Sequence, residues 1–366
     1  MSVKKQEIVS VADVADGNPS TAWSLARQLH LQDGDATEIL LTTTSIPVNY
    51  FHRDISADHH EARYYTEHSE AKRLGAKSRL YAAACFGEFA LRLSTHQGHD
   101  IDIPSRWTIV QEHQLLGAPD ILIDSLGITD IRVVVPDVFP KESAKHAVRN
   151  TVGATFSVWN LEAQYELENE GFKVELHKPY HLDGFRPQTP EFYSSGADVV
   201  VKSSGNGMPR EWENELKSAL ARSRSATWGF HTPRGKTSHN FEVMRRLAKP
   251  ERVQNFYNDL GGNTKILIGY PSELVGVVCD MRERGVPIWM IALPPRGAHE
   301  LRNLKFAIEN NLVLGEFMPR EYSHPPTFPG LEQITSGQIA GILQNLPKAK
   351  WVEGIIGTTP IWSDIA

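Results

Sequence analysis

Short hydrophobic runs alternate with longer stretches of helical periodicity along most of the chain. In the first half, runs typical of strands cover residues 7–15, 38–43, 106–110, 119–124, 131–137 and 171–176. In the second half, they cover residues 199–201, 226–230, 265–268 and 287–293. Helical patterns are found at residues 22–29, 58–93, 156–169, 211–222, 241–247, 274–284, 298–310 and 336–346. Continuous apolar strands that alternate with helices are typical of a parallel sheet covered on both faces.

The length of the chain favours two domains. At 366 residues it exceeds what one ordinary hydrophobic core accommodates. Residues 180–195 contain Gly184, Pro187 and Pro190 and show little periodicity, so we expect a linker there. The sequence therefore predicts an α/β protein with two Rossmann-like domains, each a doubly wound parallel sheet, at residues 1–185 and 186–366, the second ending in a C-terminal tail. Domains of this kind facing across a cleft bind ligands at the carboxyl ends of their strands.

One turn of small residues stands out in the second predicted domain. The strand at 199–201 leads through Ser203, Ser204, Gly205, Asn206 and Gly207 into the helix at 211–222. A strand, a glycine turn and a helix start direct backbone N–H groups and the positive end of the helix toward a phosphate. Small residues allow the backbone to approach such an anion. A glycine-rich turn that binds no ligand is the alternative.

Composition restricts the class of protein. The net charge of −6 argues against a general nucleic-acid binder, which needs a basic face. Cys85 and Cys279 lie far apart in apolar segments and are interpreted as buried thiols of a reducing compartment. We find neither a signal-peptide pattern nor an apolar run of membrane-spanning length, so a cytoplasmic location is expected. The histidines between 59 and 68 lack the paired spacing of metal ligands, and no metal is predicted.

A second stretch, from residue 285 onward, narrows the function. Gly285-x-Pro287 precedes a strand, which is followed by Pro294-Pro295, then His299-Glu300, and Asn303 three residues later. This succession resembles the donor domain of glycosyltransferases of the GT-B architecture. It is most similar to the branch with the N-acetylglucosaminyltransferase of peptidoglycan lipid intermediates and the plant monogalactosyldiacylglycerol synthases.

Other segments extend the resemblance over most of the chain. The turn at 203–207 resembles the Gly-Gly-x-x-Gly loop of that family, with a serine in place of its first glycine. Residues 119–123 resemble the Pro-Asp-hydrophobic strand of the acceptor domain. Gly17-Asn18-Pro19 is similar to the Gly-His-x-x-Pro turn, but Asn18 replaces a histidine thought to act as the base. His299-Glu300 stands where relatives often have Asp-Gln or Gln-Gln, so the sugar stays unassigned.

The resemblance implies a sugar transferred from a nucleotide-diphosphate donor to a hydroxyl-bearing acceptor, without a metal or other cofactor and with inversion. The residues expected at the donor site are Ser203, Ser204, Gly205, Asn206, Gly207, Arg234, Glu273, Asp280, Arg296, His299 and Glu300. Arg234 and Arg296 would assist with the diphosphate, and solvated surface charge is the alternative for each. Asp280, or else Glu273, would bind the ribose diol. For Glu273 the alternative is a favourable interaction with the helix dipole.

Two roles have more than one candidate: the contacts to the sugar and the base that deprotonates the acceptor. His299 and Glu300 would contact the sugar, with helix capping as the alternative. The acceptor hydroxyl needs a base. The candidates are Asp13 and Asp16, beside the first turn and acceptor-side Asn18, Asp124 at a strand end, and Asp137 at the end of a buried strand, with Asp16 and Asp137 ranked equally ahead of the others.

The motifs and the resemblance leave three functions open. The first is glycosyl transfer to a sugar, a lipid-linked or a small-molecule acceptor, with which peripheral membrane contact is compatible. The second is a nucleotide-sugar epimerase on the same scaffold. The third is a two-lobed protein that only binds a small molecule. The donor base and sugar, the acceptor, the anomeric outcome and the oligomeric state are not encoded in these motifs. A dinucleotide oxidoreductase is excluded because Gly-x-Gly-x-x-Gly does not follow the first strand.

Overall fold

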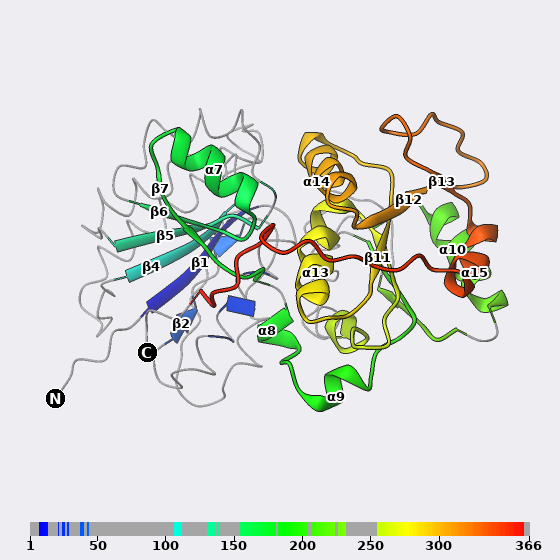
Figure 1. The fold of residues 1–366 in the computed structure, drawn as a ribbon, viewed down its shortest axis with the longest axis horizontal. Coiled ribbons are helices and arrows are strands. Elements are labelled where there is room, and N and C mark those ends of the chain that lie inside the picture. Colours follow the sequence, from blue (N-terminus) through cyan, green and yellow to red (C-terminus); the bar gives the residue numbers. More distant parts are fainter. Residues whose placement is uncertain are drawn as a thin grey trace, which may run out of the picture. The chain divides into compact units, whose positions relative to one another are not determined.

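The structure of the protein is a computed structural model. It describes residues 7–13, 21, 24–25, 28, 37–39, 42–43, 106–111, 130–136, 138, 154–180, 182–203, 207–223, 226–231 and 255–361. The chain divides into two compact units (Figure 1). Unit 1 comprises Met1–Gly184 and Ile356–Ala366, and unit 2 comprises Phe185–Ile355.

Unit 1 is built on a parallel sheet. Its described strands are β1 (Glu7–Asp13), β2 (Thr37–Ile39), β3 (Thr42–Thr43), β4 (Arg106–Gln111), β5 (Asp130–Val134), β6 (Thr155–Val158) and β7 (Lys173–Leu176). They are ordered β2-β1-β4-β5-β6-β7, with β3 also paired to β1, and every pairing is parallel. Four of the five residues of β5 are buried, as expected for a strand inside a parallel sheet.

Helix α7 (Leu161–Asn169) packs on β6 and β7. It begins at Asn160, whose side-chain oxygen accepts a hydrogen bond from the N–H of Ala163 at 2.8 Å. This is the usual role of an asparagine N-cap. Ala163 and Leu167 form the buried stripe of the helix, one turn apart.

The prediction of a helix from residue 156 was wrong at its start, because Thr155–Val158 is strand β6. The segment TFSV pairs in register with β5 and β7 on either side, and Phe156 and Val158 are buried. Aromatic and β-branched residues favour the pleated, half-buried surface of a sheet. Pairing with the neighbouring strands therefore outweighs the helical periodicity that continues into α7.

Unit 2 contains a second parallel sheet. Its described strands are β8 (Val199–Lys202), β9 (Trp228–His231), β10 (Ile266–Gly269), β11 (Trp289–Ala292), β12 (Val313–Phe317) and β13 (Gln333–Ile334). They are ordered β13-β12-β11-β10-β8-β9, again all parallel. The strand order reverses at β8, since the chain first places β9 on one side of it and later β10 on the other. In open α/β sheets, ligands bind beside such a reversal, at the carboxyl ends of the strands.

Helices cover both faces of this sheet. The principal ones are α10 (Arg210–Arg222), α13 (Pro271–Glu283), α14 (Ala298–Glu309) and α15 (Ile339–Gln344), which follows a 3-10 turn at Ser336–Gln338. Leu216 of α10 and Ile339 of α15 share one core cluster with the strands. Helices α13 and α14 pack together on β10, β11 and β12. Helix α13 is almost wholly buried, in keeping with its sequence PSELVGVVCDM.

The boundary between the units falls inside the short helix α8 (Leu182–Phe185), and α9 (Pro190–Tyr193) lies in the segment expected to be a linker. The residues after Ile355 return to unit 1, although we expected the whole tail in the second domain. The backbone N–H of Gly357 donates to the carbonyl of Trp159 at 3.0 Å, and that of Lys178 donates to the carbonyl of Thr359 at 2.9 Å. The tail is thus hydrogen-bonded to the backbone of unit 1.

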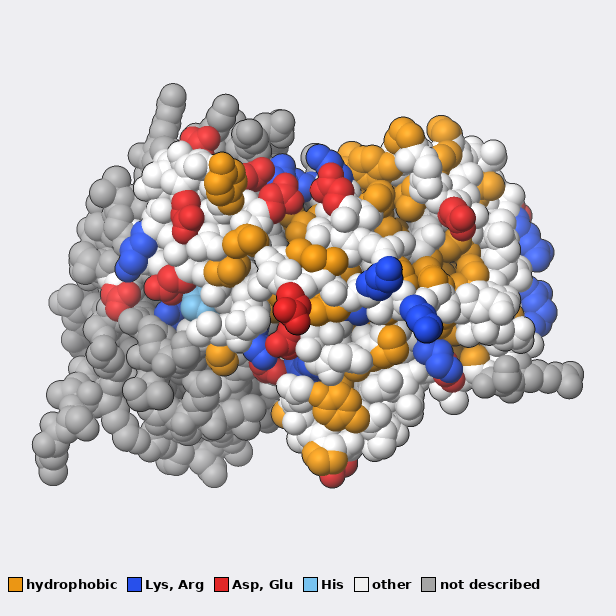
Figure 2. Space-filling model, in the orientation of Figure 1, with side chains coloured by type: hydrophobic (Ala, Val, Ile, Leu, Met, Phe, Trp, Pro, Cys, Tyr) orange, Lys and Arg blue, Asp and Glu red, His pale blue; other side chains and the backbone are white. Residues whose placement is uncertain are grey.

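No helix within the described ranges combines the length and apolarity needed to cross a bilayer. On the face in Figure 2, side chains of both charge signs are scattered over the coloured residues, without a continuous basic area. The predicted elements at 58–93, 119–124 and 241–247 lie outside the described residues.

Candidate functional site

The loops that follow β8, β10 and β11 meet at the strand reversal of unit 2. Lys202 ends β8, Tyr270 follows β10, and Arg296 lies in the loop between β11 and α14. Parallel pairing places the carboxyl ends of the three strands at one edge, with β10 in the middle. The arrangement of the strands therefore gathers three chemically distinct side chains at the place where such sheets bind ligands.

The turn after β8 is partly used for internal contacts. Ser203 is buried, and its backbone N–H donates to the carbonyl of His231 at 3.1 Å. Gly207 has a φ of +74°, a conformation that glycine adopts without strain. Helix α10 starts three residues later and carries Glu211 and Glu213 in its first turn. These carboxylates already complement the positive end of that helix.

An ion pair joins β8 to the start of α13. The ammonium of Lys202 lies 3.3 Å from a carboxylate oxygen of Glu273, in the first turn of that helix. The two side chains are only 15% and 10% exposed. The same ammonium lies 4.8 Å from the centre of the Phe256 ring. Partial burial makes this pair stronger than an exposed one, and the ring favours the cation further.

A second ion pair joins the β11 loop to the start of α14. The Arg296 guanidinium lies 3.5 Å from a carboxylate oxygen of Glu300, and Glu300 also accepts the backbone N–H of Arg296. The guanidinium carbon is 3.5 Å from the centre of the Tyr270 ring, a cation–π contact. Another nitrogen of Arg296 lies 3.4 Å from the carbonyl oxygen of Gly207. Arg296, itself in the loop after β11, thus also contacts the loops after β8 and β10.

Burial shifts the pKa values of two side chains at this edge, Tyr270 and Glu300. Burial raises the pKa of Tyr270 to about 12, although nearby Arg296 lowers it, so the phenol is neutral at physiological pH. Burial likewise raises the pKa of Glu300, a rise that its hydrogen bonds and the charge of Arg296 reduce. The charges of Arg296, Glu300 and Glu273 all act on Tyr270.

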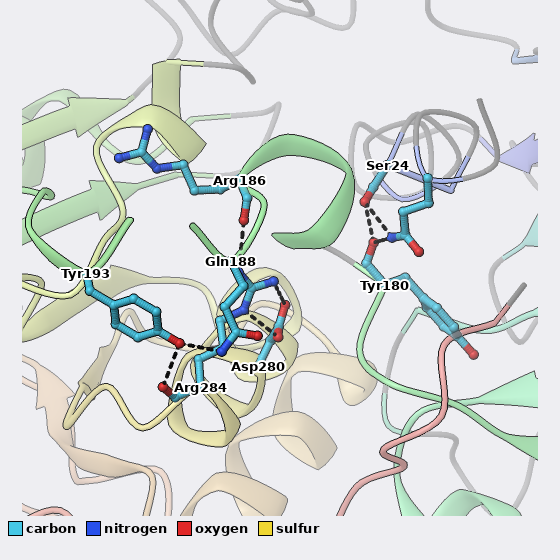
Figure 3. Close-up of polar contacts among 8 residues, drawn as sticks. Ser24, Tyr180, Arg186, Gln188, Tyr193, Asp280 and Arg284 are labelled. Carbon is cyan, nitrogen blue, oxygen red and sulfur yellow. Dashed lines mark hydrogen bonds and ion pairs between the residues drawn. The ribbon is translucent and has the colours of Figure 1, made fainter. Parts of the chain in front are cut away.

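Asp280 occupies a different environment from the one expected of a ribose contact. Its carboxylate oxygens lie 3.1 and 3.4 Å from two nitrogens of Arg284, and the side chains are 3% and 1% exposed (Figure 3). Arg284 also donates to the carbonyl of Arg186 at 2.9 Å. Asp280 lies roughly two turns further along α13 than Glu273. In this arrangement Glu273, and not Asp280, is at the carboxyl edge of the sheet.

A His–Asp pair at the carboxyl end of β9 was missed in the sequence. A ring nitrogen of His231 lies 2.7 Å from a carboxylate oxygen of Asp259. A Cβ at Gly229 would lie 2.1 Å from that same oxygen, so only glycine leaves room for the carboxylate. The two partners are distant in the sequence and belong to no short motif. Only the glycine two residues before His231 could have hinted at a close approach.

No protein-family model and no curated protein matches the chain in sequence. Solved structures do match its fold. A UDP-glucosyltransferase from Polygonum tinctorium has a TM-score of 0.57 at 12% identity, over 96% of this chain and 91% of that one. Phytolacca americana UGT2, complexed with UDP-2-fluoro-glucose and pterostilbene, has a TM-score of 0.55 at 12% identity, over 94% and 91%. The fold is the GT-B fold. The predicted fold class, two Rossmann-like parallel-sheet domains, is therefore confirmed.

The same fold also occurs in a putative UDP-N-acetylglucosamine 2-epimerase from Listeria monocytogenes. That structure has a TM-score of 0.50 at 11% identity, over 84% of this chain and 83% of that one. At such identities the likeness establishes the GT-B fold and leaves the reaction to be argued from the site.

The predicted site residues fall into three groups. Those outside the described residues are Asp16, Asn18, Asp137, Ser204, Gly205, Asn206 and Arg234. Those that the structure gathers at the strand reversal are Gly207, Glu273, Arg296 and Glu300, with Ser203 buried beside them. Asp280 is held apart in its pair with Arg284, and His299 is a residue of the first turn of α14. Lys202, which no motif indicated, joins the gathered group.

Proposed function

We propose that the protein is a glycosyltransferase that moves a sugar from a nucleotide-diphosphate donor to a hydroxyl-bearing acceptor. The observation that carries the proposal is the position of Arg296, which is stacked on Tyr270 and bound to the Gly207 turn at the strand reversal of a GT-B donor-type domain. Ligand-bound structures of the same fold contain UDP or a UDP-sugar analogue. UDP-sugars are therefore the first donors to test.

The chemistry fits the charges at this edge. Departure of the nucleoside diphosphate places negative charge on its outer phosphate, while the anomeric carbon becomes positive. A guanidinium held by an ion pair and a ring stack needs little reorganisation to meet that charge. We propose that this side-chain cation, and no metal, supports the leaving group.

Deprotonation of the acceptor is proposed for Asp16 or Asp137. Each follows a strand of the unit 1 sheet in the sequence, Asp16 after β1 and Asp137 after β5. A carboxylate there would take the proton of the acceptor hydroxyl as the oxygen attacks the anomeric carbon. Direct displacement would invert that carbon. The lipid-intermediate branch is the proposed affiliation within the GT-B glycosyltransferases, and a lipid-linked acceptor would bring the protein to a membrane surface.

The second candidate is a nucleotide-sugar epimerase, favoured by the likeness to the putative Listeria monocytogenes 2-epimerase. The two reactions differ in their need for an acceptor. An epimerase converts the donor alone, whereas a transferase leaves it intact until an acceptor is added.

A thermal-shift screen of the full chain with uridine, thymidine and guanosine diphosphates tests the proposal. At 100 times its Kd, a ligand stabilises by about 2.7 kcal/mol, which corresponds to several degrees in Tm. We expect such a shift with one nucleoside diphosphate, UDP first. The best donor is then incubated alone and with an acceptor mixture. If all three nucleotides leave Tm unchanged at millimolar concentration, the proposed function is wrong.

A further inference from the structure

The helix starts at the strand reversal are poorly suited to bind an anion by themselves. Glu211 and Glu213 lie in the first turn of α10, Glu273 in that of α13 and Glu300 in that of α14. A carboxylate in the first turn cancels the positive end of a helix and repels a second anion. In addition, Glu300 already accepts the N–H of Arg296.

Two of these carboxylates instead hold cations at the same edge. Glu273 pairs with Lys202, and Glu300 pairs with Arg296. In each pair the cation is the more exposed member, at 15% against 10% for Lys202 and Glu273, and at 39% against 3% for Arg296 and Glu300. Arg296 is therefore presented outward with Glu300 behind it, while Lys202 and Glu273 are buried to nearly the same extent.

The two cations lie on opposite sides of β10. Lys202 ends β8 and Arg296 follows β11, so about two strand spacings, roughly 10 Å, separate their backbones. Both side chains are long enough to close much of that distance. Each also rests on a buried aromatic ring, Phe256 under Lys202 and Tyr270 under Arg296. The rings and the carboxylates together fix both cations before any ligand binds.

We infer that a diphosphate ester is held at this edge by Lys202 and Arg296, and that Glu273 and Glu300 position these cations instead of contacting the ribose and the sugar. Only the identity of the ester, a nucleoside diphosphate, rests on the proposed function. The inference reverses the roles that the family resemblance implies for Glu273 and Glu300, and it adds Lys202 to the site.

The test measures binding of inorganic pyrophosphate, uridine and UDP to the full chain by calorimetry. The variants are Lys202→Met, Arg296→Met, Glu273→Gln and Glu300→Gln. Lys265→Met is the matched control, because Lys265 forms the same kind of ion pair with Asp198 just before β10, at the opposite end of that strand. Far-UV circular dichroism verifies that each variant is folded.

We expect each cation variant to weaken pyrophosphate binding about tenfold or more, and the control to stay within about twofold. In each cation variant, the affinity for pyrophosphate should also fall less steeply as the salt concentration rises. Glu273→Gln and Glu300→Gln should leave pyrophosphate affinity unchanged or raise it a few-fold, because a nearby negative charge is removed. Uridine affinity should not change in either glutamine variant.

Three results would overturn the inference. They are the absence of pyrophosphate binding to the wild type, wild-type affinity in Lys202→Met or Arg296→Met, and a loss of uridine affinity in Glu273→Gln that points to a ribose contact. Failure of the proposed function looks different. In that case pyrophosphate binds with the expected dependence on both cations, but UDP binds no more tightly than pyrophosphate.

Discussion

Replacing Asp280 with asparagine separates a structural role from a ligand-binding role. The variant keeps the shape of the side chain and removes its charge. Buried Arg284 then loses the carboxylate charge beside it, although it keeps its hydrogen bond to the carbonyl of Arg186 and its contact with the Phe192 ring. If Asp280 serves the fold, the loss must appear as lower stability and not as selective loss of nucleotide binding.

The magnitude follows from the geometry. Opposite charges 3.1 Å apart attract by about 5 kcal/mol at an effective dielectric constant near 20. Removing one partner of a buried pair costs about 3–5 kcal/mol. Because Arg186 and Phe192 compensate in part, we expect about 3 kcal/mol for Asp280→Asn. For a domain of this size, that corresponds to a Tm lower by roughly 6–12 °C.

Calorimetric unfolding of the full chain measures the effect. The double variant Asp280→Leu/Arg284→Met removes both charges and should recover most of the lost stability. The control is Glu213→Gln, which breaks the more exposed pair with Lys217 at the same helical spacing and should cost under about 1 kcal/mol. The reasoning is refuted if Asp280→Asn unfolds within about 1 kcal/mol of the wild type yet no longer binds the nucleotide.

Three further predictions concern unit 2. Gly229→Ala places a Cβ 2.1 Å from an oxygen of Asp259, so the carboxylate must turn away, and urea unfolding should show a loss of about 1–2 kcal/mol that shrinks when Asp259→Ala is added. Burial raises the pKa of Asp198, but hydrogen bonds from Lys265 and Thr227 lower it more, and the net pKa lies below its ordinary 3.8. Asp198→Asn should therefore lower the free energy of unfolding by about 1–2 kcal/mol at pH 7. In a pH series of unfolding curves, this difference between wild type and variant should disappear as pH falls below about 4. A difference that stays constant with pH would contradict a stabilising role for the Asp198 charge. Burial raises the pKa of the Cys279 thiol, so in a Cys85→Ser variant a thiol reagent should label Cys279 only as the protein unfolds, and rapid labelling under native conditions would show that the thiol is accessible.

The sequence was most informative about the strands. The run Val199-Val200-Val201 predicted β8, and residues 287–293 contain β11 (Trp289–Ala292). Both faces of these parallel strands are buried, so their sequences are continuously apolar and can be identified as strands. Two strands of unit 2 were not predicted: β12, inside the sheet, and β13, an edge strand of only two residues, which are too few to form a pattern.

The site was harder to predict from the sequence, because its ion pairs depend on which strands are neighbours in the sheet. Glu273 and Arg296 were expected near the donor, but their partners were not. Lys202 meets Glu273 only because β8 and β10 are adjacent, an order that no local motif records. The family position of Asp280 suggested a ligand contact, whereas the side chain is turned to Arg284 inside the unit. Packing around α13, which sequence spacing does not reveal, places Asp280 against Arg284 and Glu273 against Lys202.

The most direct test of the account is a calorimetric titration of UDP into the full chain, repeated with Arg296→Met and with the control Lys265→Met. We predict one binding site in the wild type, affinity about tenfold or more lower in Arg296→Met, and unchanged affinity in the control. Absence of UDP binding at millimolar concentration, or equal affinity in wild type and Arg296→Met, would contradict a nucleotide-diphosphate site at the strand reversal of unit 2.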